Sequence, residues 1–269
     1  MRGSHDMGRE KSPIHMVSAW SDVNSMVLGQ DKVSDKSNEI TAIPNLLALL
    51  DIKDCIVTID AMGTQKDIAQ QICNQGGDYI LALKGNQGLL LEDTDMFVQD
   101  AMQTEFSYVE HDYTKDVDYG HGRIETRECW TFRPKDYKKN FRTLGEWKNL
   151  ETVVIVKATR ETKNKMVTET RYYISSCACD AAFLMHAIRK HWGIESMHWI
   201  LDVTFREDAS RIRKGDSPEN MAILRHIALN TLKKYTSVKD SMPGKIQRAA
   251  LSDSFREDVL NKVLKISTL

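Results

Sequence analysis

The segment HWGIESMHWILD, residues 191–202, carries four chargeable side chains at helical spacing. These are His191, Glu195, His198 and Asp202, which follow one another at intervals of four, three and four residues. On one helix this spacing stacks the four groups along a single side, where two imidazoles and two carboxylates can bind a cation, transfer a proton or contact a phosphate. The alternative is a solvated polar face beside an apolar face containing Trp192 and Trp199.

The composition is that of a globular protein with a substantial core. The chain has 269 residues, of which 41% are hydrophobic and 28% charged. Its formal net charge of −1 gives no general attraction to nucleic acid, so any DNA-binding surface must be a local patch. No apolar run approaches the roughly 18 residues of a membrane span, and we expect no membrane partner.

The beginning of the chain and its cysteines point to the cytoplasm. The first residues, MRGSHDMGREKS, contain no apolar core of a secretion signal. The five cysteines are an odd number without a C-x-x-C pair, and Cys177-x-Cys179 alone is a weak zinc signal. We therefore expect reduced thiols in a cytoplasmic protein.

The first hundred residues alternate between strand and helix patterns. A hairpin is predicted at 14–20 and 26–33, followed by a helix at 38–50 in which Thr41 would be the N-cap and Pro44 would lie in the first turn. The later elements are a buried strand ending at Asp60, a helix at 65–74, a strand at 78–83 and a helix to about residue 99. This alternation predicts an α/β fold class with parallel strands.

The pattern changes near residue 105. Strands are predicted at 123–132, 152–160 and 166–176, with a hairpin turn at 163–165 between the last two. Helices resume at residue 180 and include one that begins around Ser217-Pro218. The predicted organisation is a core, first part, at 1–104, a β-rich insertion at 105–178, and a helical second part of the core at 179–269.

Asp60 and Glu195 are the candidate catalytic and metal-binding residues. Asp60 ends a buried strand, and ligands collect at the carboxyl ends of strands in open α/β sheets. If the fold brings the two carboxylates together, their hard oxygen atoms suit Mg²⁺, and two such ions roughly 3.5–4 Å apart support phosphodiester chemistry. The plainer interpretations are a turn residue for Asp60 and an exposed helical glutamate for Glu195.

Several segments together resemble a known family. They are HWGIESMHWILDVTFREDASRIRKG, VTIDAMGTQKDIA, YILALKGNQ, GHGRIETRE and ETRYYISS. The chain is similar, from residue 2 to about 235, to the H-repeat-associated insertion-sequence transposases of the DDE type. The resemblance implies a ribonuclease-H-like mixed sheet flanked by helices, with an all-β insertion before the helix of the catalytic glutamate. It also implies phosphoryl transfer on the DNA of transposon ends with Mg²⁺ or Mn²⁺, with Asp60 as the second catalytic carboxylate and Glu195 as the glutamate.

One part of the family pattern is absent from this sequence. The first catalytic aspartate of the family lies on a first strand that would precede Met1, so Met1 resembles an internal methionine of a longer chain. Without that strand we expect weaker metal binding, an impaired or inactive copy, and unpaired sheet edges beside the Asp60 strand, because the family's first strand lies there. Asp6 in the polar leader and Asp22 in the hairpin turn are poor substitutes.

Other polar residues are predicted to support these carboxylates or to contact DNA. His191, His198 and Asp202 form the predicted supporting network, or else a hydrogen-bonded network that only stabilises the helix. The predicted DNA contacts are Lys84, Asn86 and Gln87 after a strand, Arg123 and Arg127 on one face of a strand, and Arg206, Arg211 and Arg213 after the glutamate helix. Glu125, Glu207 and Asp208 dilute the two basic patches, so a self-paired surface is the alternative for each arginine.

Three functions compete. The leading one is a DNA-processing enzyme of the transposase class or its degenerate copy, and a homo-oligomer is one candidate assembly for it. A small-substrate metal hydrolase is the second, although Glu195-x-x-His198 occurs once and no H-E-x-x-H motif is present. The third is a non-catalytic fragment that binds DNA or a transposase subunit.

Overall fold

The computed structural model describes residues 15–33, 39–120 and 122–264, and the chain divides into two compact units. One unit is 51–191, and the other combines 1–50 with 192–269. These limits do not coincide with the predicted boundaries after residues 104 and 178. The three-part domain division therefore stays a prediction.

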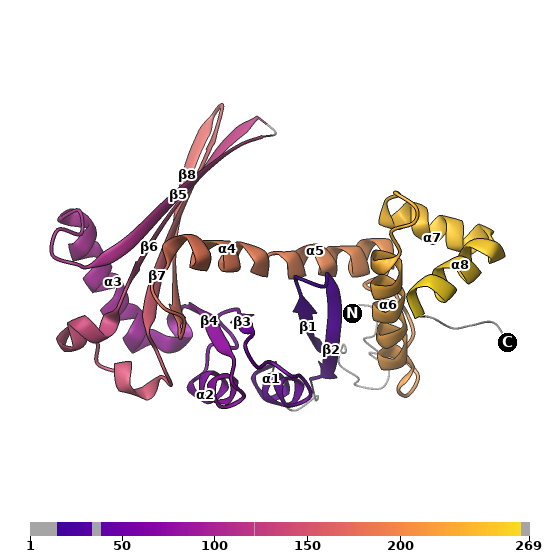
Figure 1. Ribbon diagram of the computed structural model, residues 1–269, viewed down its shortest axis with the longest axis horizontal. Helices are drawn as coiled ribbons and strands as arrows, with labels where there is room; N and C mark the ends of the chain where they lie inside the picture. The colour runs from indigo at the N-terminus through magenta and orange to yellow at the C-terminus, as the bar shows by residue number, and fades with distance from the viewer. Residues whose placement is uncertain (1–14, 34–38, 121, 265–269) are drawn as a thin grey trace. The chain divides into compact units, whose positions relative to one another are not determined.

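A mixed six-stranded sheet with flanking helices forms the unit 51–191 (Figure 1). Its strands are β3 (Ile56–Ile59), β4 (Asp78–Leu83), β5 (His111–Gly120), β6 (Arg123–Phe132), β7 (Thr152–Thr162) and β8 (Lys165–Ser175). Its helices are α2 (Lys66–Asn74), α3 (Gly88–Gln103) and α4 (Ala181–His191), with short 3₁₀ turns η3 (Gly85–Gln87), η4 (Pro134–Asn140) and η5 (Leu144–Glu146). The strand order is β3-β4-β8-β7-β6-β5, with β3 and β4 parallel and the other pairs antiparallel. The predicted α/β class with a mixed sheet is confirmed.

Helices cover both faces of this sheet. α4 packs on the face that contains Cys129 and Val156, through Leu184 and its neighbours. α3 packs on the other face, where the ring of Phe97 lies 4.9 Å from that of Phe132. Side chains alternate along a strand, so residues 129 and 132 of β6 must point to opposite faces.

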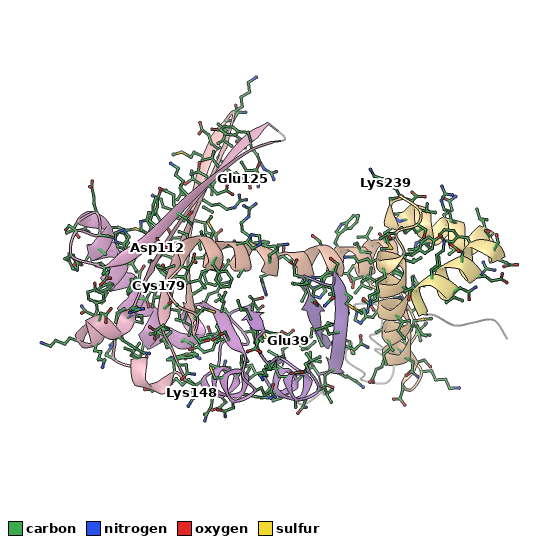
Figure 2. The ribbon with its side chains drawn as sticks, viewed as in Figure 1. Glu39, Asp112, Glu125, Lys148, Cys179 and Lys239 are labelled. Atoms are coloured by element: carbon green, nitrogen blue, oxygen red, sulfur yellow. The ribbon has the colours of Figure 1, made fainter. Side chains whose placement is uncertain are left out.

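The predicted β-rich block is a continuation of the core sheet. Its strands pair antiparallel in the order β5, β6, β7, β8, and β8 then pairs with β4 through Ile80 and Ser175. The long strands extend as an arm beyond α3 and α4 (Figure 1). At the base of the arm, Asp112 on β5 accepts a hydrogen bond from the backbone N–H of Ala181 at 2.8 Å, which satisfies one free donor at the start of α4 (Figure 2).

β3 forms one edge of the sheet. Among the described strands it pairs only with β4, in a register that places Ile56 opposite Asp78. Its backbone groups on the other side therefore have no strand partner in the described part of the chain. An unpaired edge beside the Asp60 strand was predicted.

The other unit is mainly helical. It contains the hairpin β1 (Met16–Ser21) and β2 (Met26–Lys32), then α1 (Glu39–Ala48), α5 (Gly193–Trp199), a π-helical turn η6 (Ile200–Thr204), α6 (Ser217–Lys234), α7 (Met242–Leu251) and α8 (Asp253–Leu264). A buried cluster joins Val27 of β2 to Met197, Leu201 and Leu229. The predicted hairpin and the helices after residue 217 are confirmed.

Two local predictions in this unit are wrong. α1 begins at Glu39, so Thr41 is an interior residue of the helix and not its N-cap. Pro44 likewise lies inside the helix, beyond the first turn. The acidic Glu39 at the helix start favours the earlier beginning, because carboxylates stabilise the first turn. Asp22 lies in the predicted hairpin turn, whereas Asp6 lies outside the described residues.

Two further findings concern chemistry and environment. Cys55, Cys73, Cys129, Cys177 and Cys179 are all free thiols. Within the described ranges, no helix combines the length and the apolar character needed to cross a membrane.

Candidate functional site

Asp60 lies exposed at the carboxyl end of β3. The strand is short and β-branched, IVTI, which favours extended backbone up to Ile59. Its carboxylate then starts a turn, since the Asp60 Oδ1 atom accepts a hydrogen bond from the Met62 backbone N–H at 3.1 Å. The side chain is thereby oriented by its own loop while the carboxylate stays open to a ligand.

The loop after Asp60 is tied to the neighbouring strand by Thr64, which is fully buried. The Thr64 hydroxyl lies 3.1 Å from the backbone oxygen of Asp60 and 2.7 Å from that of Ala82 on β4. Both geometries allow it to donate. The parallel pairing of β3 and β4 is thus continued past the end of β3 by a side chain.

Asn86 and Gln87 also lie against this loop. The Asn86 amide nitrogen donates to the Ala61 carbonyl at 2.6 Å, and the Gln87 amide nitrogen donates to the Thr64 carbonyl at 2.9 Å. The sequence predicted DNA contacts for both residues and missed their contact with the Asp60 loop. The sequence signal that could have indicated this contact is the position of the two amides, directly after the strand that follows the Asp60 strand. Lys84 is exposed, and its contact with DNA stays a prediction.

His191, the last residue of α4, reaches the Asp60 strand. Its Nδ1 atom lies 2.9 Å from the Thr58 hydroxyl oxygen on β3. Thr58 lies on this strand, two residues before Asp60. The structure therefore brings one of the predicted supporting residues to the strand that ends at Asp60.

Glu195, His198 and Asp202 belong to the other unit. α4 ends at His191 and α5 begins at Gly193, so the segment is not one uninterrupted α-helix. The residues 200–204 then form a π-helical turn, which contains more residues per turn than an α-helix and changes the spacing from His198 to Asp202. Glu195 and His198 lie exposed on α5, three residues apart and so on neighbouring positions of its surface.

Two buried polar side chains, His226 and Glu207, lie on α6 and on the segment before it. His226 is 7% exposed, and burial lowers its pKa to about 4, with a smaller contribution in the same direction from His198. Glu207 is also buried, and burial raises its pKa while Arg225 opposes the shift. The Arg225 guanidinium lies 3.8 Å from the Glu207 carboxylate. The sequence did not identify the buried His226 or the pairing of Arg225 with Glu207.

The carboxylates fit a divalent ion by their chemistry. Asp60 and Glu195 both offer exposed oxygen atoms, the donor type that Mg²⁺ takes while it keeps several waters. In the described ranges, no three His, Cys, Asp or Glu side chains gather in a way that could hold a metal ion. Asp60 and Glu195 belong to different units, so their convergence stays a prediction.

The arginines of the arm surround a carboxylate. Arg123 and Arg127 share a face of β6, as predicted, and both pair with Glu125, at 2.6 Å in the case of Arg123 (Figure 2). Arg160 is the cross-strand partner of Glu125 on β7 and lies 3.8 Å from its carboxylate. Three guanidinium groups therefore pair with one carboxylate, while Asp118, the cross-strand partner of Glu125 on β5, adds a second negative charge nearby. The sequence did not predict Arg160 at this site, because only the register between β6 and β7 places Arg160 opposite Glu125.

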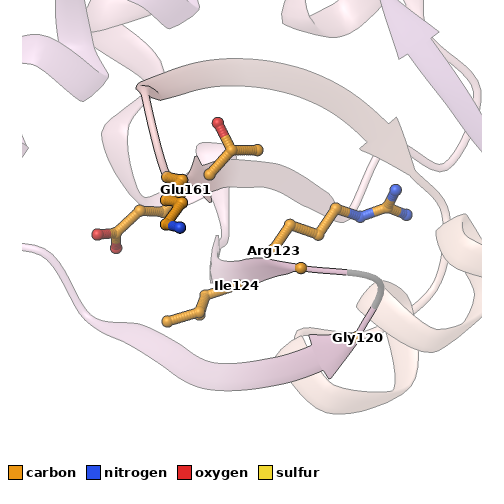
Figure 3. Close-up of a pocket in the computed structure, with 7 residues that line it drawn as sticks. Gly120, Arg123, Ile124 and Glu161 are labelled. Atoms are coloured by element: carbon orange, nitrogen blue, oxygen red, sulfur yellow. The ribbon is translucent and has the colours of Figure 1, made fainter.

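The tip of the arm is hollowed between its two hairpins. Gly120, Arg123, Ile124 and Glu161 contribute to the lining of this hollow, and Figure 3 shows the Arg123 and Glu161 side chains directed away from each other. The lining contains one acidic side chain, Glu161, and two basic ones, Arg123 and Lys163. We assign no chemistry to it.

The second predicted basic patch follows η6. Arg206, Arg211 and Arg213 are all exposed. Arg206 has a φ of 53°, a left-handed conformation that marks a sharp turn at the end of the helical segment. Contact of these residues with DNA stays a prediction.

Comparison with known proteins identifies the class. A family profile described as "Transposase DDE domain" matches residues 2–231, and the chain belongs to this family. The chain is 44% identical over 264 residues to "Putative transposase YncI" of Escherichia coli O157:H7, covering 97% of this chain and 66% of that protein. It is 40% identical over 265 residues to "H repeat-associated putative transposase YhhI" of Escherichia coli K12, covering 97% of this chain and 69% of the relative. The chain thus spans about two thirds of the length of these relatives.

Proposed function

We propose that this chain carries two of the carboxylates of a metal-dependent DNA phosphoryl transferase that acts on transposon ends. Asp60 and Glu195 would hold Mg²⁺ or Mn²⁺. The observation that carries the proposal is the Asp60 carboxylate, exposed at the end of β3 and oriented by a loop with several hydrogen bonds, in a member of the DDE transposase family.

The protein's own residues would have distinct tasks. The bound ion would activate an attacking oxygen and neutralise charge on the phosphate. His191 is held against Thr58 on the Asp60 strand, so it would orient groups or carry a proton beside that strand. His198 and Asp202 would do the same beside Glu195.

DNA would be bound through local basic patches, because the chain as a whole has a net charge of −1. The arginines Arg123 and Arg127 supply one patch, and Arg206, Arg211 and Arg213 supply another. Lys84 would contact the backbone near the Asp60 loop. Binding of two DNA ends is compatible with a homo-oligomer, and the substrate would be met in the cytoplasm.

The test is cleavage of DNA that contains transposon ends, with Mg²⁺ or Mn²⁺, by the wild-type chain and by the variants Asp60→Asn and Glu195→Gln. Asp54→Asn is the matched control, because Asp54 is an exposed aspartate at the other end of β3, where its φ of 58° also suits asparagine. Because the sequence predicts an impaired copy, we expect only weak metal-dependent cleavage by the wild type, loss of that cleavage in both carboxylate variants and its retention in the control.

Two outcomes would contradict the proposal. Cleavage that persists in Asp60→Asn would reject the site assignment. DNA binding by a wild-type chain that does not cleave under any of these conditions would favour the alternative, a non-catalytic fragment that binds DNA or a transposase subunit.

A further inference from the structure

Three side-chain amides converge on the loop that follows Asp60, and we call them the amide clamp. They are Gln65, Asn86 and Gln87. Gln65 donates to the Met62 carbonyl at 3.2 Å, and Asn86 and Gln87 donate to the carbonyls of Ala61 and Thr64. The clamp thus binds the loop at three carbonyl groups, those of Ala61, Met62 and Thr64, that lie outside the helices and strands.

The donors of Asn86 and Gln87 are used within the protein. Each primary amide has two N–H donors. Those of Asn86 meet the carbonyls of Ala61 and, at 3.3 Å, of Thr64. Those of Gln87 meet the Thr64 carbonyl and, at 3.4 Å, the Gln65 side-chain oxygen. Direct donation to a DNA phosphate would require breaking these bonds.

The clamp is connected to the carboxylate through a short path. Asp60 Oδ1 accepts a hydrogen bond from the Met62 N–H, so the position of Met62 sets the direction of the carboxylate. Gln65 fixes the carbonyl of Met62, and Asn86 fixes that of the preceding residue. The buried Thr64, which accepts from both Asn86 and Gln87, prevents the far end of the loop from shifting.

We infer that Asn86 and Gln87 are positioning residues, which hold the Asp60 loop so that its carboxylate is pre-oriented for a divalent ion. This inference rests on the proposed function. Partners that orient a metal ligand typically change metal affinity by roughly 10–100-fold when they are removed. The amides therefore act on DNA chemistry through Asp60, and the sequence prediction of a direct DNA contact is replaced by this role.

The experiment measures the dissociation constant of Mn²⁺ for the full chain. The readout is the water-proton relaxation rate, which differs between free and protein-bound Mn²⁺. The test variants are Asn86→Leu and Gln87→Met, which keep the side-chain size and remove the donors. Gln99→Met is the matched control, because Gln99 is an exposed amide on α3 that donates to Asp95 and lies away from the Asp60 loop in the sequence. We expect the Mn²⁺ dissociation constant to rise about tenfold in either test variant and to stay unchanged in the control.

A second readout needs no metal. Hydrogen exchange of the Met62 backbone amide, which donates to Asp60, should become faster in the test variants and not in Gln99→Met. Thermal unfolding identifies a variant that fails to fold. In that case Gln65→Met, which removes the single donor to Met62, takes its place.

The outcomes separate the two proposals. If Asp60→Asn binds Mn²⁺ as tightly as the wild type does, the proposed metal site is refuted and this inference is refuted with it. If binding depends on Asp60 but is the same in wild type, Asn86→Leu and Gln87→Met, the positioning role alone is refuted. A tenfold loss with an unchanged unfolding midpoint supports it.

Discussion

Acidification should destabilise the unit that contains Glu195, because of one buried histidine. His226 on α6 is 7% exposed, and burial lowers its pKa from 6.5 to about 4. The unfolded chain therefore takes up a proton near pH 6.5, whereas the folded chain does so only near pH 4. Stability from neutral His226 is fully present above pH 6.5 and is lost as the pH falls from 6.5 towards 4.

The magnitude follows from these two pKa values. The difference in proton binding reduces the free energy of unfolding by about 2 kcal/mol at pH 5 and about 3 kcal/mol at pH 4, relative to pH 8. Glu207 acts in the opposite direction, because burial raises its pKa and its ionised form is disfavoured in the folded state. Its protonation on acidification relieves that penalty, so the net loss measured for the wild type is smaller than the contribution of His226 alone.

The assay is urea unfolding at pH 8 and pH 5, applied to the wild type, to His226→Gln and to His186→Gln. The last is the matched control, since His186 is an exposed histidine on α4. We expect the loss of stability between the two pH values to be about 2 kcal/mol smaller in His226→Gln than in wild type, and the control to follow the wild type. An equal loss in wild type and His226→Gln would refute the reasoning from burial.

Three further predictions concern single contacts. Lys245→Met should lower the free energy of unfolding by about 2 kcal/mol in urea titrations, because its buried ammonium donates at 2.8 and 2.6 Å to two carbonyls at the end of α6; exposed Lys239→Met should have little effect. Gly77→Ala should lower the thermal midpoint, at a cost of about 1–3 kcal/mol, because the new Cβ would lie 2.8 Å from the Ile52 carbonyl oxygen. Glu125→Gln should tighten DNA binding roughly two- to tenfold at low salt, measured by fluorescence anisotropy, because it removes the carboxylate between three arginines; unchanged binding would show that this face does not meet DNA.

Strand and helix positions could be predicted largely from local sequence. The run RIETRECWTF forms β6 over Arg123–Phe132, and the apolar run DYILAL forms β4 over Asp78–Leu83, each within the predicted bounds. Such runs combine β-branched or aromatic residues with flanking turn signals, so their information is contained in a short window. The pairing of β4 with β8 is long-range, and the sequence therefore did not reveal that the β-rich block continues the core sheet.

The regular helical period expected through residues 191–202 does not hold at its end, where residues 200–204 form a π-helical turn. An ideal α-helix has 3.6 residues per turn, and the prediction applied this period through the whole segment. In the structure Met197 and Leu201 both enter the buried cluster with Leu229, and the π-helical turn lies over that contact. The change of period therefore falls at Leu201, a member of that buried cluster.

The Asp60 site depends on bonds between segments that are distant in sequence. Thr58 meets His191 across 133 positions, while Thr64 meets Ala82 across 18 and Asn86 meets Ala61 across 25. The carboxylate is therefore fixed on the strand side by the end of α4 and on the loop side by β4 and the turn after it. A substitution in α4 or in the turn after β4 can change Asp60 without contacting it, so a catalytic defect in such a variant would not identify a residue that touches the substrate.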